Sequence, residues 1–205
     1  RITNETISVH REEVLKGARK YIYPLQHSKH RIVLITATII TVAVISFLAY
    51  CTVALYRLYQ HNTFLYRVTQ VVPFPIARVG GSFVEYENYL FELRHYVHYY
   101  QNQLEQNFND DKQQLIDRRQ QALQDVITQA YVKKLAKDNK VGVSNKEVDA
   151  RIEVVRGQNR LGNNNKVLAD VLRNYWGWSI SDFKRSLRQQ ILTEKVVAKL
   201  DTETK

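Results

Sequence analysis

A run of 25 residues without a charged side chain, residues 32–56, constrains this chain more than any other feature. A helix needs about 20 apolar residues to cross the roughly 30 Å hydrocarbon core of a bilayer, and this run is longer. The rest of the chain is polar and basic. We therefore predict a basic cytoplasmic tail (1–31), a single transmembrane helix (32–56), a juxtamembrane linker (57–75) and a domain outside the cytoplasm (76–205).

The basic residues around the apolar run predict its orientation. Those in the tail close to the run are Lys16, Arg19, Lys20, Lys29 and Arg31. At a comparable distance after the run we find only Arg57 and Arg67. Short loops rich in Lys and Arg stay on the cytoplasmic side, so we expect the N-terminus inside and the large C-terminal part outside. The alternative is a random scatter of basic residues.

A cleaved signal peptide and a lipoprotein signal are two other interpretations of the run. The apolar region of a signal peptide has about 7–15 residues, whereas this run is much longer and 31 residues precede it. Residues 48–51 have the outline of a lipoprotein cleavage site ending at Cys51, but Tyr50 stands where a small residue is expected. An uncleaved single-pass anchor fits the sequence better.

The composition indicates where the protein is located and which molecules its positive charge attracts. The single cysteine excludes an intrachain disulfide, and an outward-facing domain without disulfides is more typical of bacteria, so we expect the bacterial cytoplasmic membrane. The formal charge is +10, yet Lys and Arg are dispersed among acidic residues and Gln. Attraction to anionic lipid headgroups explains this charge more simply than nucleic-acid binding. Because the chain starts with Arg1, we expect a processed protein or a piece of a longer one.

The spacing of apolar residues predicts a mainly helical, all-α domain with one short strand at its start. We expect the strand at 76–79, followed by a Gly80-Gly81 turn. Five helices should follow. The first begins at Ser82, in a capping box with Glu85, and the second covers 111–139, after an interruption at 107–110. The third begins at Ser144, in a capping box with Glu147; after a loop at 157–165, the fourth covers about 167–175 and ends near Gly177, and the fifth is capped by Ser179 or Ser181.

Residues with catalytic or metal-binding chemistry do not form a recognisable pattern. His95 and His98 are three positions apart but lack a third ligand at a sensible spacing, and such helical pairs usually lie on the surface. Cys51 lies in the membrane run, and Gly80-Gly81 alone is too weak a signal for a phosphate-binding loop. We therefore predict no catalytic residue, no metal site and no cofactor in this chain.

Aromatic residues are the more informative set, with thirteen tyrosines in the chain. Five of them crowd one predicted helix on more than one face, so one core cannot bury them all. Tyrosine combines apolar area with a hydroxyl group, which suits a surface that holds extended polypeptide. The candidate polypeptide-binding residues are Tyr86, Tyr89, Tyr96, Tyr99, Tyr100 and Trp178. The alternative is that they are packing residues. Of Trp176 and Trp178, we expect one in the core and one exposed.

Four segments, in order, are similar to one family. Residues 76–81 resemble the opening of the N-terminal chaperone domain shared by SurA, PpiD and PrsA. Residues 126–136 resemble its aliphatic helix with a Lys-rich end, and residues 140–149 its "G-(I/V)-x-V-S-x-x-E-V-D" element. Residues 177–191 resemble its "G-(apolar)-S-x-x-D-F-(K/R)…L-R-x-Q-(I/L)" element. The match spans about 125 residues and departs from the pattern at Gly80, where Asn is usual, and in the Tyr- and Gln-rich first helix.

The resemblance implies a helical extracytoplasmic chaperone domain, anchored in the layout of PpiD, that binds unfolded or newly translocated polypeptides near the Sec translocon. In this family a parvulin-type prolyl isomerase domain often follows, so isomerase activity would require a further domain after Lys205. The family also implies a later segment that pairs with the strand at 76–79. The alternative function is a non-catalytic structural subunit of a cell-envelope membrane complex.

Overall fold

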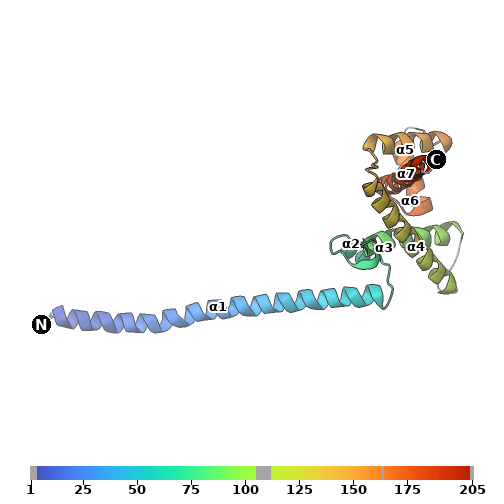
Figure 1. Ribbon diagram of the computed structural model, residues 1–205. Coiled ribbons are helices and arrows are strands. Elements are labelled where there is room, and N and C mark those ends of the chain that lie inside the picture. Colours follow the sequence, from blue (N-terminus) through green and yellow to red (C-terminus); the bar gives the residue numbers. More distant parts are fainter. Residues whose placement is uncertain (1–3, 105–111, 163, 204–205) are drawn as a thin grey trace. The chain divides into compact units, whose positions relative to one another are not determined.

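The computed structural model describes residues 4–104, 112–162 and 164–203 and divides the chain into two compact units, Arg1–Gln60 and His61–Lys205. The described residues are mainly helical, as predicted, with one small two-stranded sheet (Figure 1).

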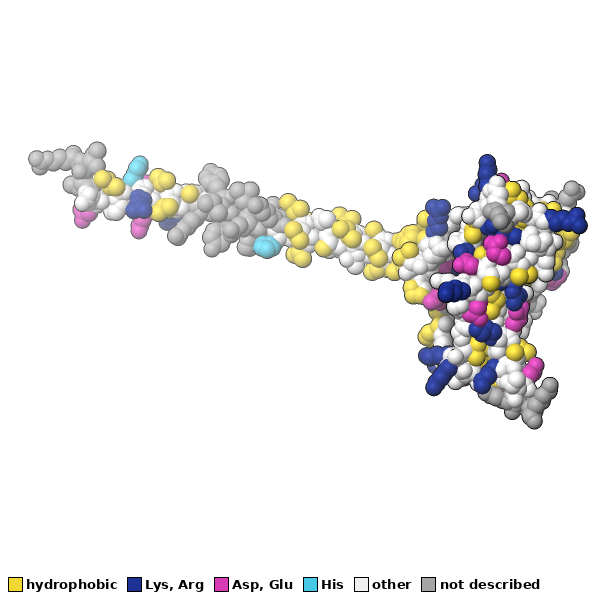
Figure 2. All heavy atoms as spheres, turned by 90° about the horizontal axis from the view of Figure 1, so that it is seen from above, with side chains coloured by type: hydrophobic (Ala, Val, Ile, Leu, Met, Phe, Trp, Pro, Cys, Tyr) yellow, Lys and Arg dark blue, Asp and Glu magenta, His cyan; other side chains and the backbone are white. Residues whose placement is uncertain are grey.

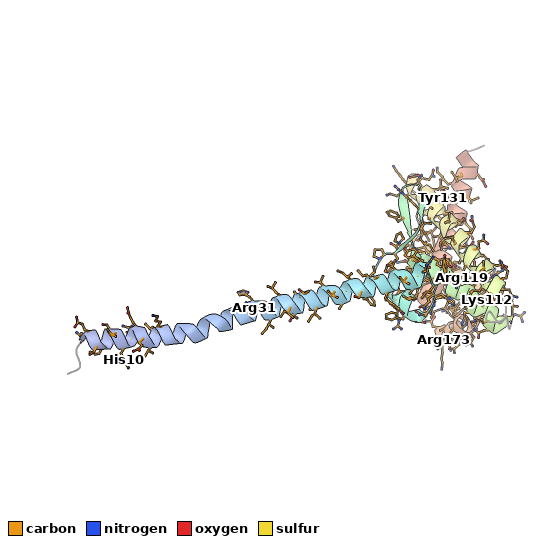
Figure 3. The ribbon with its side chains drawn as sticks, turned by 90° about the horizontal axis from the view of Figure 1, so that it is seen from below. His10, Arg31, Lys112, Arg119, Tyr131 and Arg173 are labelled. Atoms are coloured by element: carbon orange, nitrogen blue, oxygen red, sulfur yellow. The ribbon has the colours of Figure 1, made fainter. Side chains whose placement is uncertain are left out.

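The first unit is a single helix, α1 (Asn4–Tyr56), of 53 residues. The predicted tail is therefore helical over most of its length. The segment His30–Tyr56 is long and apolar enough to cross a membrane, and Arg31 marks its start in Figure 3. Hydroxyl groups of Thr38, Thr41 and Thr52 donate to carbonyls four residues earlier, at 2.8–2.9 Å. These bonds satisfy the three hydroxyl groups within the helix.

A second, short helix, α2 (Thr63–Thr69), lies in the segment that we predicted to be a linker. The side chain of Asn62 caps it by accepting from the amide of Leu65 at 2.8 Å. Seven residues give too short a periodic pattern to be recognised in the sequence, and this element was missed. Pro73 and Pro75 follow, and the first strand begins at the second of them.

The sheet is a hairpin of β1 (Pro75–Val79) and β2 (Ser82–Glu85), joined by Gly80 and Gly81. Both glycines have positive φ angles, 52° and 91°, as a two-residue hairpin turn requires. The predicted capping box of Ser82 and Glu85 is wrong, because these residues form β2 and the next helix begins at Tyr86. Glu85 makes no side-chain capping bond there. β1 also finds its partner strand within the hairpin itself.

Five further helices complete the second unit (Figure 1): α3 (Tyr86–Gln103), α4 (Lys112–Asp138), α5 (Asn145–Gln158), α6 (Asn165–Trp176) and α7 (Ile180–Glu203). Figure 1 shows α5, α6 and α7 gathered where α4 ends, with α3 beside the first part of α4. The predicted interruption at 107–110 lies outside the described residues. The predicted loop at 157–165 is shorter than expected, since α5 continues to Gln158.

Three predicted helix ends are confirmed. Ser144 and Glu147 form the complete capping box of α5, and Lys195 of α7 also bonds to Glu147 at 2.7 Å. These contacts, with that to Lys195 the largest, lower the pKa of Glu147 to about 2. Ser179, and not Ser181, caps α7, because its hydroxyl accepts from the amide of Asp182 at 3.2 Å. Gly177 ends α6 in the left-handed conformation.

An apolar cluster between α5, α6 and α7 forms one core of this unit. Its buried members are Val148, Ile152, Leu168, Leu172, Phe183, Leu187 and Ile191. Within each helix they recur at a spacing of four, so each helix turns one stripe toward the other two. On the face of this unit seen in Figure 2, basic and acidic side chains are intermixed over the surface.

Candidate functional site

The predicted tyrosines of α3 fall into two groups. Tyr86 and Tyr89 are buried, at 2% and 5% exposure, and their rings meet edge to face at 5.2 Å between centroids. Tyr96, Tyr99 and Tyr100 lie further along the helix and are half-buried. The helix therefore does not bury all five, as expected from their crowding, but the first two belong to the core and do not reach the surface.

An aromatic wall runs from α3 to the turn between α6 and α7. We define it by Tyr99, Trp176, Trp178, His95 and Phe91. The Tyr99 and Trp176 rings stack at 4.7 Å between centroids, and Trp176 and Trp178 at 5.6 Å. The ring centroids of His95 and Trp178 are 3.9 Å apart, and the Phe91 ring stacks on Trp178 at 6.3 Å between centroids. The wall thus joins residues about 80 positions apart in the sequence.

The turn at Gly177 positions the two tryptophans. Its φ angle is 66°, and a Cβ atom there would lie 2.9 Å from Cγ of His98 on α3. A side chain at this position would therefore meet both backbone strain and a clash. The ring nitrogen Nε2 of His98 lies 3.2 Å from the carbonyl oxygen of Asn174, which holds the end of α6 against α3. As expected, one tryptophan packs against the core, Trp178, and the other, Trp176, is 37% exposed.

His95 is buried, contrary to the expectation that both histidines lie on the surface. Burial among the rings lowers the pKa of His95 to about 4, although the Asp182 carboxylate opposes this shift. Its Nε2 atom and Nε1 of Trp178 have no hydrogen-bond partner among the described residues. Both side chains line a pocket of about 180 Å³, together with Tyr66 and Arg94. Within the described part of the chain, no group of three or more His, Cys, Asp or Glu side chains is placed to hold a metal ion.

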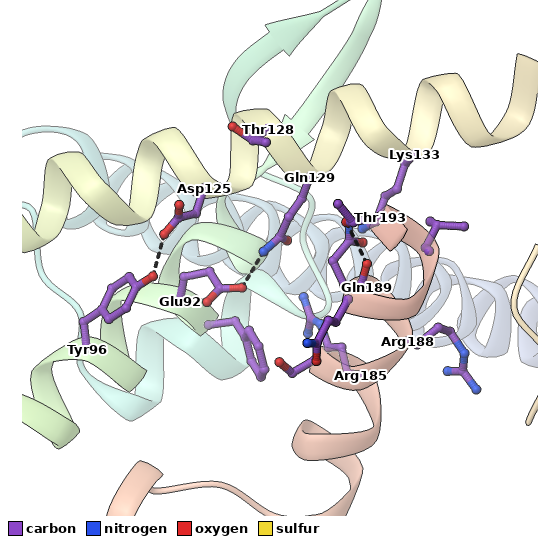
Figure 4. A pocket seen from close by; sticks show the side chains of 14 residues that line it. Glu92, Tyr96, Asp125, Thr128, Gln129, Lys133, Arg185, Arg188, Gln189 and Thr193 are labelled. Carbon is purple, nitrogen blue, oxygen red and sulfur yellow. Dashed lines mark hydrogen bonds between the residues drawn. The ribbon is translucent and has the colours of Figure 1, made fainter. Parts of the chain in front are cut away.

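A larger cleft of about 470 Å³ lies between α3, α4 and α7 (Figure 4). Hydrogen bonds cross between α3 and α4 in its wall: the Tyr96 hydroxyl donates to Asp125, and the Gln129 amide donates to Glu92 at 2.7 Å. From α7, Gln189 lies beside them, and its Nε2 has no partner among the described residues. The cleft therefore offers both donors and acceptors to a bound molecule.

Burial controls the charges in this cleft. It raises the pKa of Glu92, and the hydrogen bond from Gln129 counteracts the shift. It lowers the pKa of Lys133, as does the nearby Arg185 guanidinium. The pKa of Tyr96 is raised by burial and by its bond to Asp125. The charged forms of Glu92, Lys133 and Tyr96 are therefore disfavoured relative to water.

One ion pair connects the cleft with the aromatic wall. Arg185 of α7 donates to both carboxylate oxygens of Glu87 at 2.6 and 2.7 Å, and also to Asn88 at 2.9 Å. Its guanidinium carbon lies 4.2 Å from the centroid of the Phe91 ring. The sequence does not indicate this pair, because partners 98 residues apart leave no local signal.

Comparison with protein families gives one match, to the family described as the SurA-like N-terminal domain, over residues 25–197. Comparison with curated proteins gives no match, and comparison with solved structures gives none. The matched range contains the whole apolar segment His30–Tyr56, the helices α2 to α6 and most of α7. Because the match covers most of the chain, this protein belongs to the family of SurA-like N-terminal domains.

Proposed function

We propose that this chain is a membrane-anchored chaperone that holds unfolded or newly translocated polypeptides outside the cytoplasm. The observation that carries the proposal is the family match over residues 25–197, because SurA-like domains bind unfolded polypeptides in general. The apolar segment His30–Tyr56 supplies the anchor, and the basic tail favours an inside N-terminus. A position beside the translocon and a parvulin-type isomerase domain after residue 205 are further parts of the proposal.

The aromatic wall and the cleft are the surfaces that we assign to polypeptide binding. Trp176 and Tyr99 present stacked rings with exposed area, and Tyr100 lies beside them with the Arg118 guanidinium carbon 4.4 Å from its ring centroid. Tyr86 and Tyr89 leave the candidate set, since they are buried. Tyr96 enters it through the cleft, which it lines. Trp178 lies behind Trp176 and supports it.

The chemistry of these surfaces suits reversible binding. Exposed rings contribute apolar area, and the amide and hydroxyl groups of the cleft exchange hydrogen bonds with a peptide backbone. Neither surface is deep or fully apolar, so a bound segment would keep part of its contact with water. Weak contacts of this kind allow a client to leave and fold.

The test uses the full chain reconstituted in lipid nanodiscs and an unfolded, aggregation-prone client. Wild-type chain in several-fold molar excess should suppress light scattering by the client, and Trp176→Ala combined with Tyr99→Ala should lose most of that effect. The matched control is Tyr175→Ala, because Tyr175 is on the same helix and 49% exposed but does not belong to the wall. Circular dichroism checks that all variants are folded.

Folded wild-type chain that fails to suppress aggregation would contradict the proposal. So would a stable, stoichiometric partner that stays bound after mild detergent extraction and covers the aromatic wall, because that is the behaviour of a structural subunit. Prolyl isomerisation should be absent with these 205 residues alone.

A further inference from the structure

We propose that the outward face of α2 and the turn after it docks onto the outer lipid headgroup layer. The face consists of Phe64, Arg67 and Val71, and the inference rests on the membrane anchor of the proposed function. Phe64 and Val71 are 54% and 83% exposed, and Arg67 is exposed as well. Spacings of three and four place the three side chains on one side of the helical turn.

The opposite side of α2 is fixed to the domain. Leu65 and Thr69 are buried. The Tyr66 hydroxyl donates to Glu87 at 3.1 Å, and the Arg94 guanidinium carbon lies 4.7 Å from the Tyr66 ring centroid. Arg94 also donates to the hydroxyl of Thr63 at 3.1 Å. Because these contacts fix α2 on the domain, they also fix the side of the domain on which Phe64 and Val71 are exposed.

The chain between the anchor and α2 is very short. The amides of Leu58 and Gln60 donate to the carbonyls of Val53 and Ala54, at 3.1 and 3.0 Å, so residues up to 60 continue the end of α1. Asn62 already caps α2. Only residue 61 separates these two hydrogen-bonded ends. Even fully extended, the seven steps from residue 56 to residue 63 span at most about 25 Å.

This short connection places α2 beside the bilayer. A helical span of 27 residues, His30–Tyr56, is about 40 Å long, more than the roughly 30 Å of the hydrocarbon core. Its end therefore reaches the headgroup layer unless the helix is strongly tilted. A helix that starts so few residues later begins in that layer or next to it.

The side chains match the chemistry of the layer. Aromatic rings are favoured at the membrane interface, and an aliphatic side chain such as Val71 gains from leaving water. The Arg67 guanidinium binds lipid phosphates and gains from an anionic surface. Since the anchor keeps the face close to the membrane, its effective concentration there is high, and three side chains are enough for docking.

The test measures the depth of single nitroxide labels on the full chain with Cys51→Ser, in nanodiscs of phosphatidylcholine and phosphatidylglycerol. Labels at Phe64→Cys and Val71→Cys should collide more with oxygen, which dissolves in lipid, than with a water-soluble nickel chelate. Labels at Val154→Cys and Val167→Cys, which are exposed on α5 and α6, should show the reverse. Neutral lipid alone should reduce the depth of the labels at positions 64 and 71, and Arg67→Glu should reduce it in the anionic lipid.

Two results would overturn the docking. Labels at 64 and 71 that behave like those at 154 and 167 would place the face in water, and labels shielded from both reagents would indicate a protein contact. Retention of the chain in the lipid fraction after an alkaline wash tests the anchor separately, and client aggregation tests the chaperone. An inserted, active chain with water-exposed labels would remove this inference alone, whereas a chain lost in the wash would remove the anchor and the docking together.

Discussion

The contacts among α5, α6 and α7 centre on an apolar cluster, whereas α3, which also buries Leu90, Leu93 and Val97, adds polar and aromatic contacts to α4 and α7. In the first region, stripes of Leu, Ile, Val and Phe fill the space. In the second, Glu87, Glu92 and His95 are buried or nearly so, and each needs a specific partner or stays uncharged. Buried polar groups cost stability unless they are satisfied, so their presence is more typical of a working surface than of a core.

The largest expected effect lies in the apolar cluster. Leu168→Ala should lower the free energy of unfolding by about 2–5 kcal/mol, because Leu168 is 1% exposed and its removal leaves a cavity. Chemical denaturation of the full chain in detergent measures the change. Val167→Ala, at the exposed neighbouring position, should cost less than about 0.5 kcal/mol. Similar losses at both positions would mean that the cluster does not dominate stability.

Lowering the pH should destabilise the fold through protonation of His95 in the aromatic wall. The folded pKa of His95 is about 4, against 6.5 in the ordinary case, so the unfolded chain binds more protons between these values. The contribution of the neutral imidazole to the free energy of unfolding is therefore complete above about pH 6.5 and is lost as the pH falls toward 4. The loss should approach about 3 kcal/mol at most.

His95→Phe should remove that part of the pH dependence. The stability difference between wild type and His95→Phe, measured by denaturation at pH 7 and near pH 4, isolates this histidine from the other titrating groups. A difference that does not change with pH would show that the wall does not hold the imidazole neutral.

The ion pair between α3 and α7 should have a smaller effect. Arg185→Leu leaves the Glu87 carboxylate, which is 9% exposed, without its cation. The cost should be about 2 kcal/mol, less than for a fully buried pair, because the arginine side chain is 37% exposed. Adding Glu87→Gln should recover part of the loss in a double-mutant cycle. Additive losses would contradict direct coupling.

The smallest effect is expected in the wall of the cleft. Tyr96→Phe removes the hydroxyl that donates to Asp125 and should cost about 1 kcal/mol. Tyr131→Phe, at a position that is 52% exposed, serves as the control and should change stability little. Denaturation midpoints compare the two variants. An equal change in both would show that the bond to Asp125 contributes nothing.

The same contrast explains how much the sequence revealed. In the C-terminal half, Val148, Ile152, Phe183, Leu187 and Ile191 recur at every fourth position along their helices, and each is buried. Helix ends at residues 144, 177 and 179 were also predictable, because capping is a local interaction. Apolar stripes and caps depend on neighbours within a few residues, which a sequence displays directly.

The surface around α3 was less predictable. Ser82 and Glu85 fit a capping box, but a two-glycine turn just before them paired the segment with β1 instead. Tyr86 and Tyr99 look alike in sequence, and which of them is buried depends on where α6 and α7 return. The role of the half-buried tyrosines in binding polypeptides stays a prediction.

The pairing of Glu87 with Arg185 also has a consequence for the order of events during synthesis. Its partners are 98 residues apart, and Phe183, Leu187 and Ile191 of the same late helix complete the core. Closing so long a loop is slow compared with forming local helices. Until α7 has left the ribosome and joined the rest, the apolar stripes of α5 and α6 lack their cover. A protein proposed to shield unfinished chains thus exposes apolar surface of its own until α7 has been synthesised.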